Sequence, residues 1–164
     1  MSKGFSHIGL STQDMDATVE FYQGLLGFKC VAENRITVEE GGYLRQIMFD
    51  IGDGQFIDFL EPHDVPGIAE GYDTGITGGL GVPSMFYHVA LNLPTLEALT
   101  DMRSHLLAKG VQVSPIVDHG PGQSIYFKDP NQIQLEFTVE VREFDGGDAD
   151  GSFTIRKHLL DPVG

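Results

Sequence analysis

Short segments in which hydrophobic and polar residues alternate recur along this chain, and turn-forming residues separate them. Asp129-Pro130-Asn131 predicts a tight turn, because proline fixes φ and the Asp and Asn side chains bond their own backbone. The residues after this turn alternate strictly from Ile133 to Val139. The apolar side chains therefore share one face of a strand and the polar ones share the other. Glu136 is the one carboxylate on that polar face before position 140.

The first half of the chain predicts one helix and four strands. The helix begins at Asp14 or Asp16 and ends at Gly27, with apolar residues at helical spacing between them. Gly52-Asp53-Gly54 predicts a hairpin turn. The strands are expected at residues 5–12, 28–31, 43–51 and 56–60. In the last of these, Asp58 faces the opposite way from its neighbours Ile57 and Phe59.

The second half repeats this order. Its opening segment, Phe86-Tyr87-His88-Val89-Ala90-Leu91, repeats Phe5-Ser6-His7-Ile8-Gly9-Leu10 in the form Phe-X-His-aliphatic-small-Leu. A helix from Pro94-Thr95 to Gly110 follows, and then strands at 111–113, 124–127 and 133–139. Each half thus runs strand, helix, strand, strand, strand, and each ends in an acid between two apolar residues. The sequence therefore predicts a duplicated βαβββ module.

We expect a single domain over residues 1–164. Module one spans about residues 4–62 and module two about residues 85–141. The segment between them, about 63–84, is rich in glycine and proline and predicts a linker or a mobile loop over a site. Residues 142–164 lie outside the repeat and are expected to form a solvated arm that packs on a partner subunit.

Charge and composition limit the partners. The formal net charge of −14 argues against nucleic acid or an anionic membrane, and it is compatible with a cationic or neutral small molecule. No apolar run approaches the roughly 20 residues that span a bilayer, and the N-terminus has no apolar signal segment. Cys30 is the single cysteine, so a disulfide framework within the chain and a thiolate metal cluster are excluded. We expect a cytoplasmic protein.

The repeat brings four metal-ligating residue types into matched positions. His7 and His88 each lie in the middle of the first strand of a module, and Asp58 and Glu136 each lie in the last strand. If a pseudo-twofold axis relates the halves, these four positions converge. Two imidazoles and one carboxylate with open positions are the ligand set of non-haem Fe(II), and they also suit Zn, Ni and Mn.

Two motifs carry a resemblance to a known family. The repeated Phe-X-His and the segment Tyr-Phe-X-Asp-Pro-X-X-X-X-Leu-Glu-Phe, which ends at Phe137, are similar to those of the vicinal oxygen chelate superfamily. This superfamily includes glyoxalase I, type I extradiol dioxygenases, fosfomycin-resistance enzymes and bleomycin-resistance proteins. The resemblance covers about residues 4–141. It implies an α+β fold in which the two βαβββ modules form a half-open mixed β-barrel around a divalent metal, and a homodimer.

The resemblance also implies roles for individual residues. His7, His88 and Glu136 match the metal-ligand positions. Asp58 matches the position of a fourth ligand, which is a longer Glu in glyoxalase I. Tyr126 lies ten residues before Glu136, and His119 lies seven before Tyr126; they resemble the catalytic tyrosine and histidine of extradiol dioxygenases.

Three functions remain open on this basis. An Fe(II) dioxygenase acting on a small catechol-like substrate is favoured, with His119 as acid/base because histidine is the side chain that ordinarily exchanges protons near working pH. The second is a glyoxalase-like isomerase, lyase or epimerase, in which a carboxylate moves a proton between adjacent carbons. The third is a protein that binds a drug without catalysis.

Overall fold

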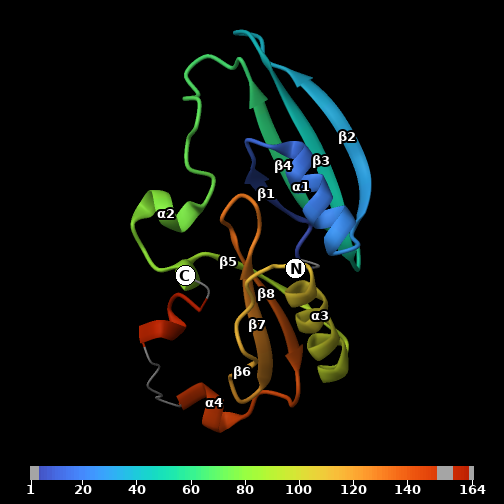
Figure 1. The fold of residues 1–164 in the computed structure, drawn as a ribbon, viewed down its shortest axis with the longest axis vertical. Coiled ribbons are helices and arrows are strands. Elements are labelled where there is room, and N and C mark those ends of the chain that lie inside the picture. The colour runs from blue at the N-terminus through green and yellow to red at the C-terminus, as the bar shows by residue number, and fades with distance from the viewer. Residues whose placement is uncertain (1–3, 151–156, 163–164) are drawn as a thin grey trace. The chain divides into compact units, whose positions relative to one another are not determined.

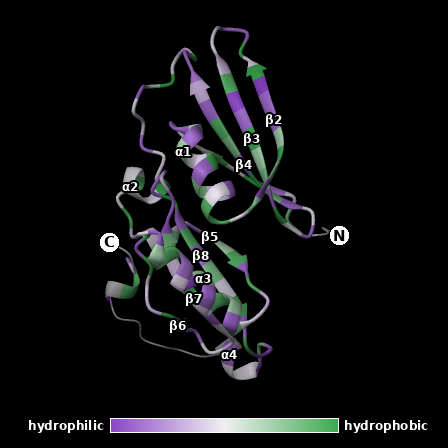
Figure 2. Ribbon diagram, turned by 45° about the vertical axis from the view of Figure 1, so that its right-hand side comes forward, coloured by the Kyte–Doolittle hydropathy of each residue, from purple (hydrophilic) through white to green (hydrophobic). Residues whose placement is uncertain are grey.

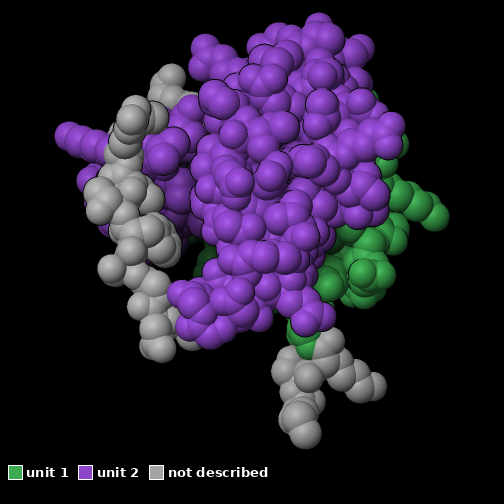
Figure 3. All heavy atoms as spheres, turned by 90° about the horizontal axis from the view of Figure 1, so that it is seen from below, with its two compact units in different colours: residues 1–74 green, residues 75–164 purple. Residues whose placement is uncertain are grey.

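The computed structural model describes residues 4–150 and 157–162, and these residues form two compact units. The first unit covers residues 1–74 and the second covers residues 75–164 (Figure 3). Each unit has its own four-stranded sheet.

The first unit is a βαβββ module (Figure 1). Its strands have the spatial order β1-β4-β3-β2, in which β1 runs parallel to β4 and the other neighbours are antiparallel. Gly52 pairs with Gln55 across the predicted hairpin turn. Its elements are β1 (His7–Ser11), α1 (Met15–Val19), the π-helix η1 (Glu20–Leu25), β2 (Lys29–Thr37), β3 (Tyr43–Gly52) and β4 (Gln55–His63).

Helix α1 and the η1 segment that continues it supply side chains to the core on one face of this sheet. The helix begins at Asp14, whose side chain accepts a hydrogen bond from the Ala17 amide at 2.9 Å. The ring of Tyr22, which is fully buried, lies 5.4 Å from that of Phe49 and 4.9 Å from that of Phe59. Residues along the strands alternate between hydrophobic and hydrophilic (Figure 2). Gly27 ends the helical segment with a φ of 78°, as predicted.

The second unit repeats the arrangement. Its sheet has the order β5-β8-β7-β6, with β5 parallel to β8 and the other neighbours antiparallel. The predicted α+β class with two βαβββ modules is therefore confirmed. The elements are α2 (Ile76–Leu80), the 3-10 helix η2 (Ser84–Phe86), β5 (His88–Asn92), α3 (Leu96–Ala108), β6 (Val117–Asp118), β7 (Gly122–Lys128), β8 (Gln134–Glu140), α4 (Gly146–Asp150) and the 3-10 helix η3 (Lys157–Leu159).

The strand predicted at residues 111–113 of the second unit is found further along the chain. Residues 111–113 form no strand; Val113 makes a single bridge to Phe127, and the fourth strand of the sheet is β6, Val117–Asp118. The intervening Pro115 lacks a backbone N–H and cannot donate to a strand ladder. The hydroxyl of Ser114 instead accepts a hydrogen bond from the Tyr126 amide at 3.0 Å.

The Gly-rich connection is partly helical. It contains α2 and η2, which have no apolar periodicity from which to predict them. Near η2, both the amide and the hydroxyl of Ser84 donate to the carboxylate of Asp161, at 2.8 and 2.7 Å. This contact joins the last described residues to the segment before β5. None of the helices in the described part of the chain has both the length and the apolar composition that crossing a bilayer requires.

Candidate metal and acid-base site

Strand register gives the two modules the same arrangement of histidine, acid and small residue. His7 pairs with Phe56 and His88 pairs with Gln134, so each acid lies two residues further along the neighbouring strand. Because side chains alternate with a period of two, the histidine and the acid of each module lie on one face. In the first unit this is the face opposite α1, since Ile57 and Phe59 carry the core.

The small residue of the repeat lies beside the acid. Gly9 pairs with Asp58, and Ala90 pairs with Glu136. A Cβ built on Gly9 would meet no heavy atom within 4 Å, so space is open on the strand next to Asp58. The motif Phe-X-His-aliphatic-small-Leu contains this signal, because the small residue follows the histidine by two positions in both halves.

His88 and Glu136 form a close pair in the second unit. The Nε2 atom of His88 lies 3.0 Å from Oε2 of Glu136, and Nδ1 of His88 lies 2.8 Å from the carbonyl oxygen of Met85. A carbonyl only accepts, so Nδ1 carries a hydrogen and Nε2 is the atom directed at the carboxylate. A backbone carbonyl bonded to one ring nitrogen is the usual way in which a metal-ligating histidine is oriented.

The pair shifts the pKa of both groups. The hydrogen bond to Glu136 raises the pKa of His88, although burial acts against it. Burial acts to raise the pKa of Glu136, but hydrogen bonds with His88 and Ser124 outweigh it, and the pKa lies below its ordinary value. The charged forms of both groups are therefore favoured together.

The spacing of this pair fits joint ligation of a metal ion. Nitrogen and oxygen ligands lie about 2.0–2.2 Å from Zn²⁺. At these lengths two ligand atoms are about 3.4 Å apart at the tetrahedral angles typical of zinc, and about 3 Å apart at the right angles of a six-coordinate ion. The 3.0 Å between Nε2 and Oε2 agrees with the second of these values. Nε2 and a carboxylate oxygen are also the donor types expected for the predicted metals.

The other two predicted ligands, His7 and Asp58, belong to the first unit. His7 is exposed, and its Nδ1 lies 3.2 Å from the hydroxyl of Ser6. Asp58 is 7% exposed; its Oδ2 accepts from Nε2 of Gln46 at 2.8 Å, and its buried Oδ1 has no hydrogen-bond partner among the described residues. Within either unit, the described residues form no cluster of three or more metal-ligating side chains.

An unpartnered buried carboxylate oxygen is costly unless a cation, a water molecule or a proton donor satisfies it. Asp58 Oδ1 therefore fits a site that takes a bound group, and it is the second observation that suits a metal ion.

The predicted acid-base residues are in direct contact. Nε2 of His119 lies 2.8 Å from the hydroxyl of Tyr126, and the two rings stand at 88°. Tyr126 pairs with Glu136 across β7 and β8, and its ring centroid lies 6.3 Å from that of His88. His119, Tyr126, Glu136 and His88 therefore form one continuous group in the second unit.

Tyr126 keeps its proton in this setting. It is 3% exposed, and burial, followed by the negative charge of Glu136, raises its pKa well above the ordinary value. A neutral phenol can donate its hydrogen to His119 or to a bound molecule. The loop holds His119 in place, because its amide donates to the carbonyl of Gly122 at 2.8 Å.

Sequence reasoning missed Gln46, the partner of Asp58. A polar residue on a half-exposed strand gives no signal by itself, and its contact depends on the register of β3 against β4.

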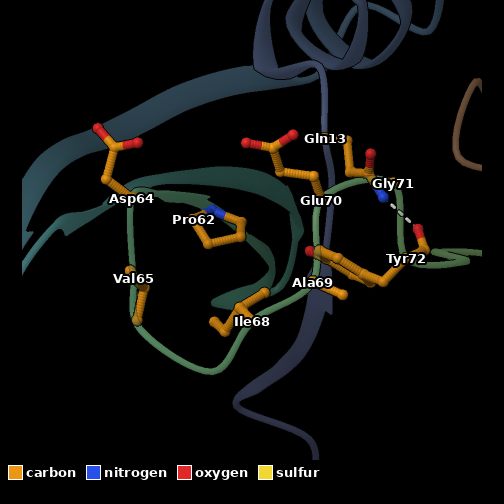
Figure 4. A pocket seen from close by; sticks show the side chains of 9 residues that line it. All are labelled: Gln13, Pro62, Asp64, Val65, Ile68, Ala69, Glu70, Gly71 and Tyr72. Atoms are coloured by element: carbon orange, nitrogen blue, oxygen red, sulfur yellow. Dashed lines mark hydrogen bonds between the residues drawn. The ribbon is translucent and has the colours of Figure 1, made fainter.

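The first unit also contains a cavity of about 270 Å³ (Figure 4). Pro62 near the end of β4 and residues after β4 line it, together with Gln13, whose side-chain amide donates to the carbonyl of Tyr72. Figure 4 shows the carboxylates of Asp64 and Glu70 above the apolar side chain of Ile68. The lining includes none of the six predicted site residues, so the cavity adds nothing to the proposed metal site.

Comparison with known proteins identifies one family. Residues 4–137 match the family model described as the Glyoxalase/Bleomycin resistance protein/Dioxygenase superfamily. No curated protein matches the chain significantly.

Several solved structures share the fold. A lactoylglutathione lyase from Agrobacterium tumefaciens is 16% identical, with a TM-score of 0.59 over 92% of this chain and 98% of that one. A fosfomycin resistance protein from Listeria monocytogenes is 20% identical, with a TM-score of 0.56 over 86% and 96%. An antibiotic binding protein from a Streptomyces species is 14% identical, with a TM-score of 0.59 over 85% and 97%.

Proposed function

Because the chain belongs to the Glyoxalase/Bleomycin resistance protein/Dioxygenase superfamily, we propose that it is a divalent-metal enzyme acting on a small molecule with two neighbouring oxygen atoms. The favoured reaction is the Fe(II)-dependent oxygenation of a catechol-like substrate.

The metal would be held by His7, His88 and Glu136. The 3.0 Å spacing of His88 Nε2 and Glu136 Oε2 supports this ligand set, and His7 enters it as the repeat counterpart of His88. When bound, Fe(II) supplies the Lewis acidity and the redox chemistry that the reaction of a catechol with O₂ requires.

The contact between His119 and Tyr126 is the observation that favours oxygenation over the other candidate reactions. Nε2 of His119, on a loop, lies within hydrogen-bond distance, 2.8 Å, of a phenol that burial keeps protonated. In the proposed reaction Nε2 of His119 takes the proton of a catechol hydroxyl and later returns it. The Tyr126 hydroxyl then turns its hydrogen toward a substrate oxygen. Both groups belong to the same continuous set as Glu136.

The test begins with anaerobic purification, elemental analysis of the bound metal, and oxygen-uptake assays with a panel of catechols after Fe(II) loading. Iron together with catechol-dependent uptake is expected, and Glu136→Ala should abolish both. His119→Gln should retain iron and lose uptake, whereas His105→Gln on the exposed side of α3 should retain both. Iron-loaded protein without uptake on any catechol contradicts the oxygenation proposal.

One observation favours a second candidate, an isomerase or epimerase. Oδ1 of Asp58 has no hydrogen-bond partner in the part of the chain that the structure describes, and this carboxylate oxygen would serve as a base or as a fourth ligand, as in the glyoxalase-type arrangement. A carboxylate there could move a proton between two adjacent carbons of a hydroxyketone. Bound zinc or nickel with no oxygen uptake, together with loss of turnover on a hydroxyketone in Asp58→Asn, would support this candidate over the first.

A further inference from the structure

The carboxylate of Asp58 lies at the end of a chain of side-chain hydrogen bonds that crosses three strands. Asn34 on β2 donates from Nδ2 to Oε1 of Gln46 at 3.1 Å, and Gln46 on β3 donates from Nε2 to Oδ2 of Asp58 at 2.8 Å. The bond from Asn34 to Oε1 of Gln46 directs the other end of the Gln46 amide, Nε2, at the acid. One carboxylate oxygen of Asp58 is thereby occupied and the other, Oδ1, is left without a partner among the described residues.

The matching strand position in the second module holds Ser124. Gln46 pairs with Leu60, two residues beyond Asp58, and Ser124 pairs with Thr138, two residues beyond Glu136. The Ser124 hydroxyl donates its hydrogen to Oγ1 of Thr138 at 2.9 Å. Asp58 is therefore the acid that has a side-chain amide held against it.

The lengths of donor and acid are complementary in module one. Asp58 is one methylene shorter than a glutamate would be, and Gln46 carries its donor two bonds further from the backbone than a serine would.

We propose that Gln46, oriented by Asn34, is a positioning residue that holds Oδ2 of Asp58 and so commits Oδ1 to the divalent metal ion of the proposed site. This inference rests on the metal site of the proposed function, and specifically on its second candidate, in which Asp58 is a fourth ligand. Hydrogen-bonded partners of metal ligands typically contribute 10–100-fold to metal affinity. Gln46 thus offsets the short reach of aspartate by fixing its orientation.

The test is a length exchange between donor and acid, with metal affinity as the readout. Mn²⁺ or Co²⁺ is titrated into the metal-free full-length chain, and binding is followed by electron paramagnetic resonance for Mn²⁺ or by the visible spectrum of Co²⁺. Gln46→Ser should weaken binding about 10–100-fold, and Asp58→Glu alone should weaken it because Glu and Gln46 compete for the same space. The double variant Gln46→Ser/Asp58→Glu combines a shorter donor with a longer acid, which removes this competition, and should recover most of the loss.

Controls separate positioning from folding. Gln23→Ser removes an amide at an exposed position of η1 and should leave affinity unchanged. Thermal unfolding of each metal-free variant reports whether the fold is intact. A Gln46→Ser protein that folds and binds as tightly as the wild type overturns the proposal, as does a double variant with no recovery.

Glu136→Ala distinguishes this inference from the proposed function. If Glu136→Ala loses the metal while the Gln46 and Asp58 variants keep it, the metal enzyme stands and the role of Gln46 does not. If the wild-type protein takes up neither ion, the proposed function fails and the inference fails with it.

Discussion

Substitutions at Gly9 test two properties separately: the stability of the first sheet, and the need for open space beside Asp58 when a metal binds. Gly9 lies within β1 and is not among the residues with positive φ, and a Cβ added there would meet nothing within 4 Å. The backbone at this position thus accepts an ordinary side chain. The matching residue of the second module is already alanine, Ala90, beside Glu136.

The expected change in stability follows from the conformational freedom that glycine loses on folding. Glycine in the interior of a strand costs roughly 0.5–1 kcal/mol relative to alanine. For a chain of this size, 1 kcal/mol corresponds to about 2–4 °C in melting temperature. Gly9→Ala should therefore raise the melting temperature by about 1–4 °C. Gly9→Val should be at least as stable as the wild type, since β-branched residues suit strands, but it fills the space next to Asp58 and should weaken metal binding.

Thermal unfolding of the metal-free proteins and Mn²⁺ titration measure the two effects separately. Gly27→Ala is the matched control, because φ at Gly27 is 78° and a Cβ is strained there by roughly 1–2 kcal/mol. The reasoning is refuted if Gly9→Ala lowers the melting temperature as Gly27→Ala does, or if Gly9→Val binds Mn²⁺ as tightly as the wild type.

Three further predictions test the packing and charge around the site. Tyr126→Phe removes the hydroxyl that meets His119 and should cost about 1 kcal/mol in unfolding free energy, with a larger loss of turnover; equal turnover contradicts the proposed role. The stabilisation from the His88–Glu136 pair should be largest between pH 4.5 and 6.5, the ordinary pKa values of the two groups. It is lost at lower pH, as Glu136 is protonated through its lowered pKa, and at higher pH, as His88 is deprotonated through its raised pKa. The melting temperature of the metal-free wild type should therefore exceed that of Glu136→Gln most within this pH window. A difference that stays constant across pH would contradict the prediction. Asp14→Ala removes the cap of α1 and should cost about 1 kcal/mol in chemical unfolding; no change would mean that the cap is dispensable.

The sequence predicted the features that depend on periodicity. The strict alternation after Asn131 identified β8, and the repeat around His7 and His88 identified the duplicated module. It also indicated His119 and Tyr126 as candidate catalytic residues through their resemblance to those of extradiol dioxygenases, although their contact with each other was not predicted. These predictions succeed because alternation and register follow from backbone geometry alone.

The features that the sequence did not predict depend on contacts between distant segments. Gln46 cannot be told apart from other polar strand residues in the sequence, because its contact with Asp58 depends on how β3 pairs with β4. Residues 111–113 have strand-forming composition, but the strand ladder begins beyond Pro115. Helix α2 contains two glycines and no apolar stripe, so its local sequence argues against a helix.

The central claim is that both modules contribute ligands to one metal ion. The most direct test measures metal content by elemental analysis in the wild type and in His7→Ala and His88→Ala, purified side by side with a folding check by circular dichroism. The account predicts one divalent metal ion per chain in the wild type and loss of it in each variant, although the two histidines lie in different modules. Unchanged metal content in folded His7→Ala and His88→Ala would contradict it.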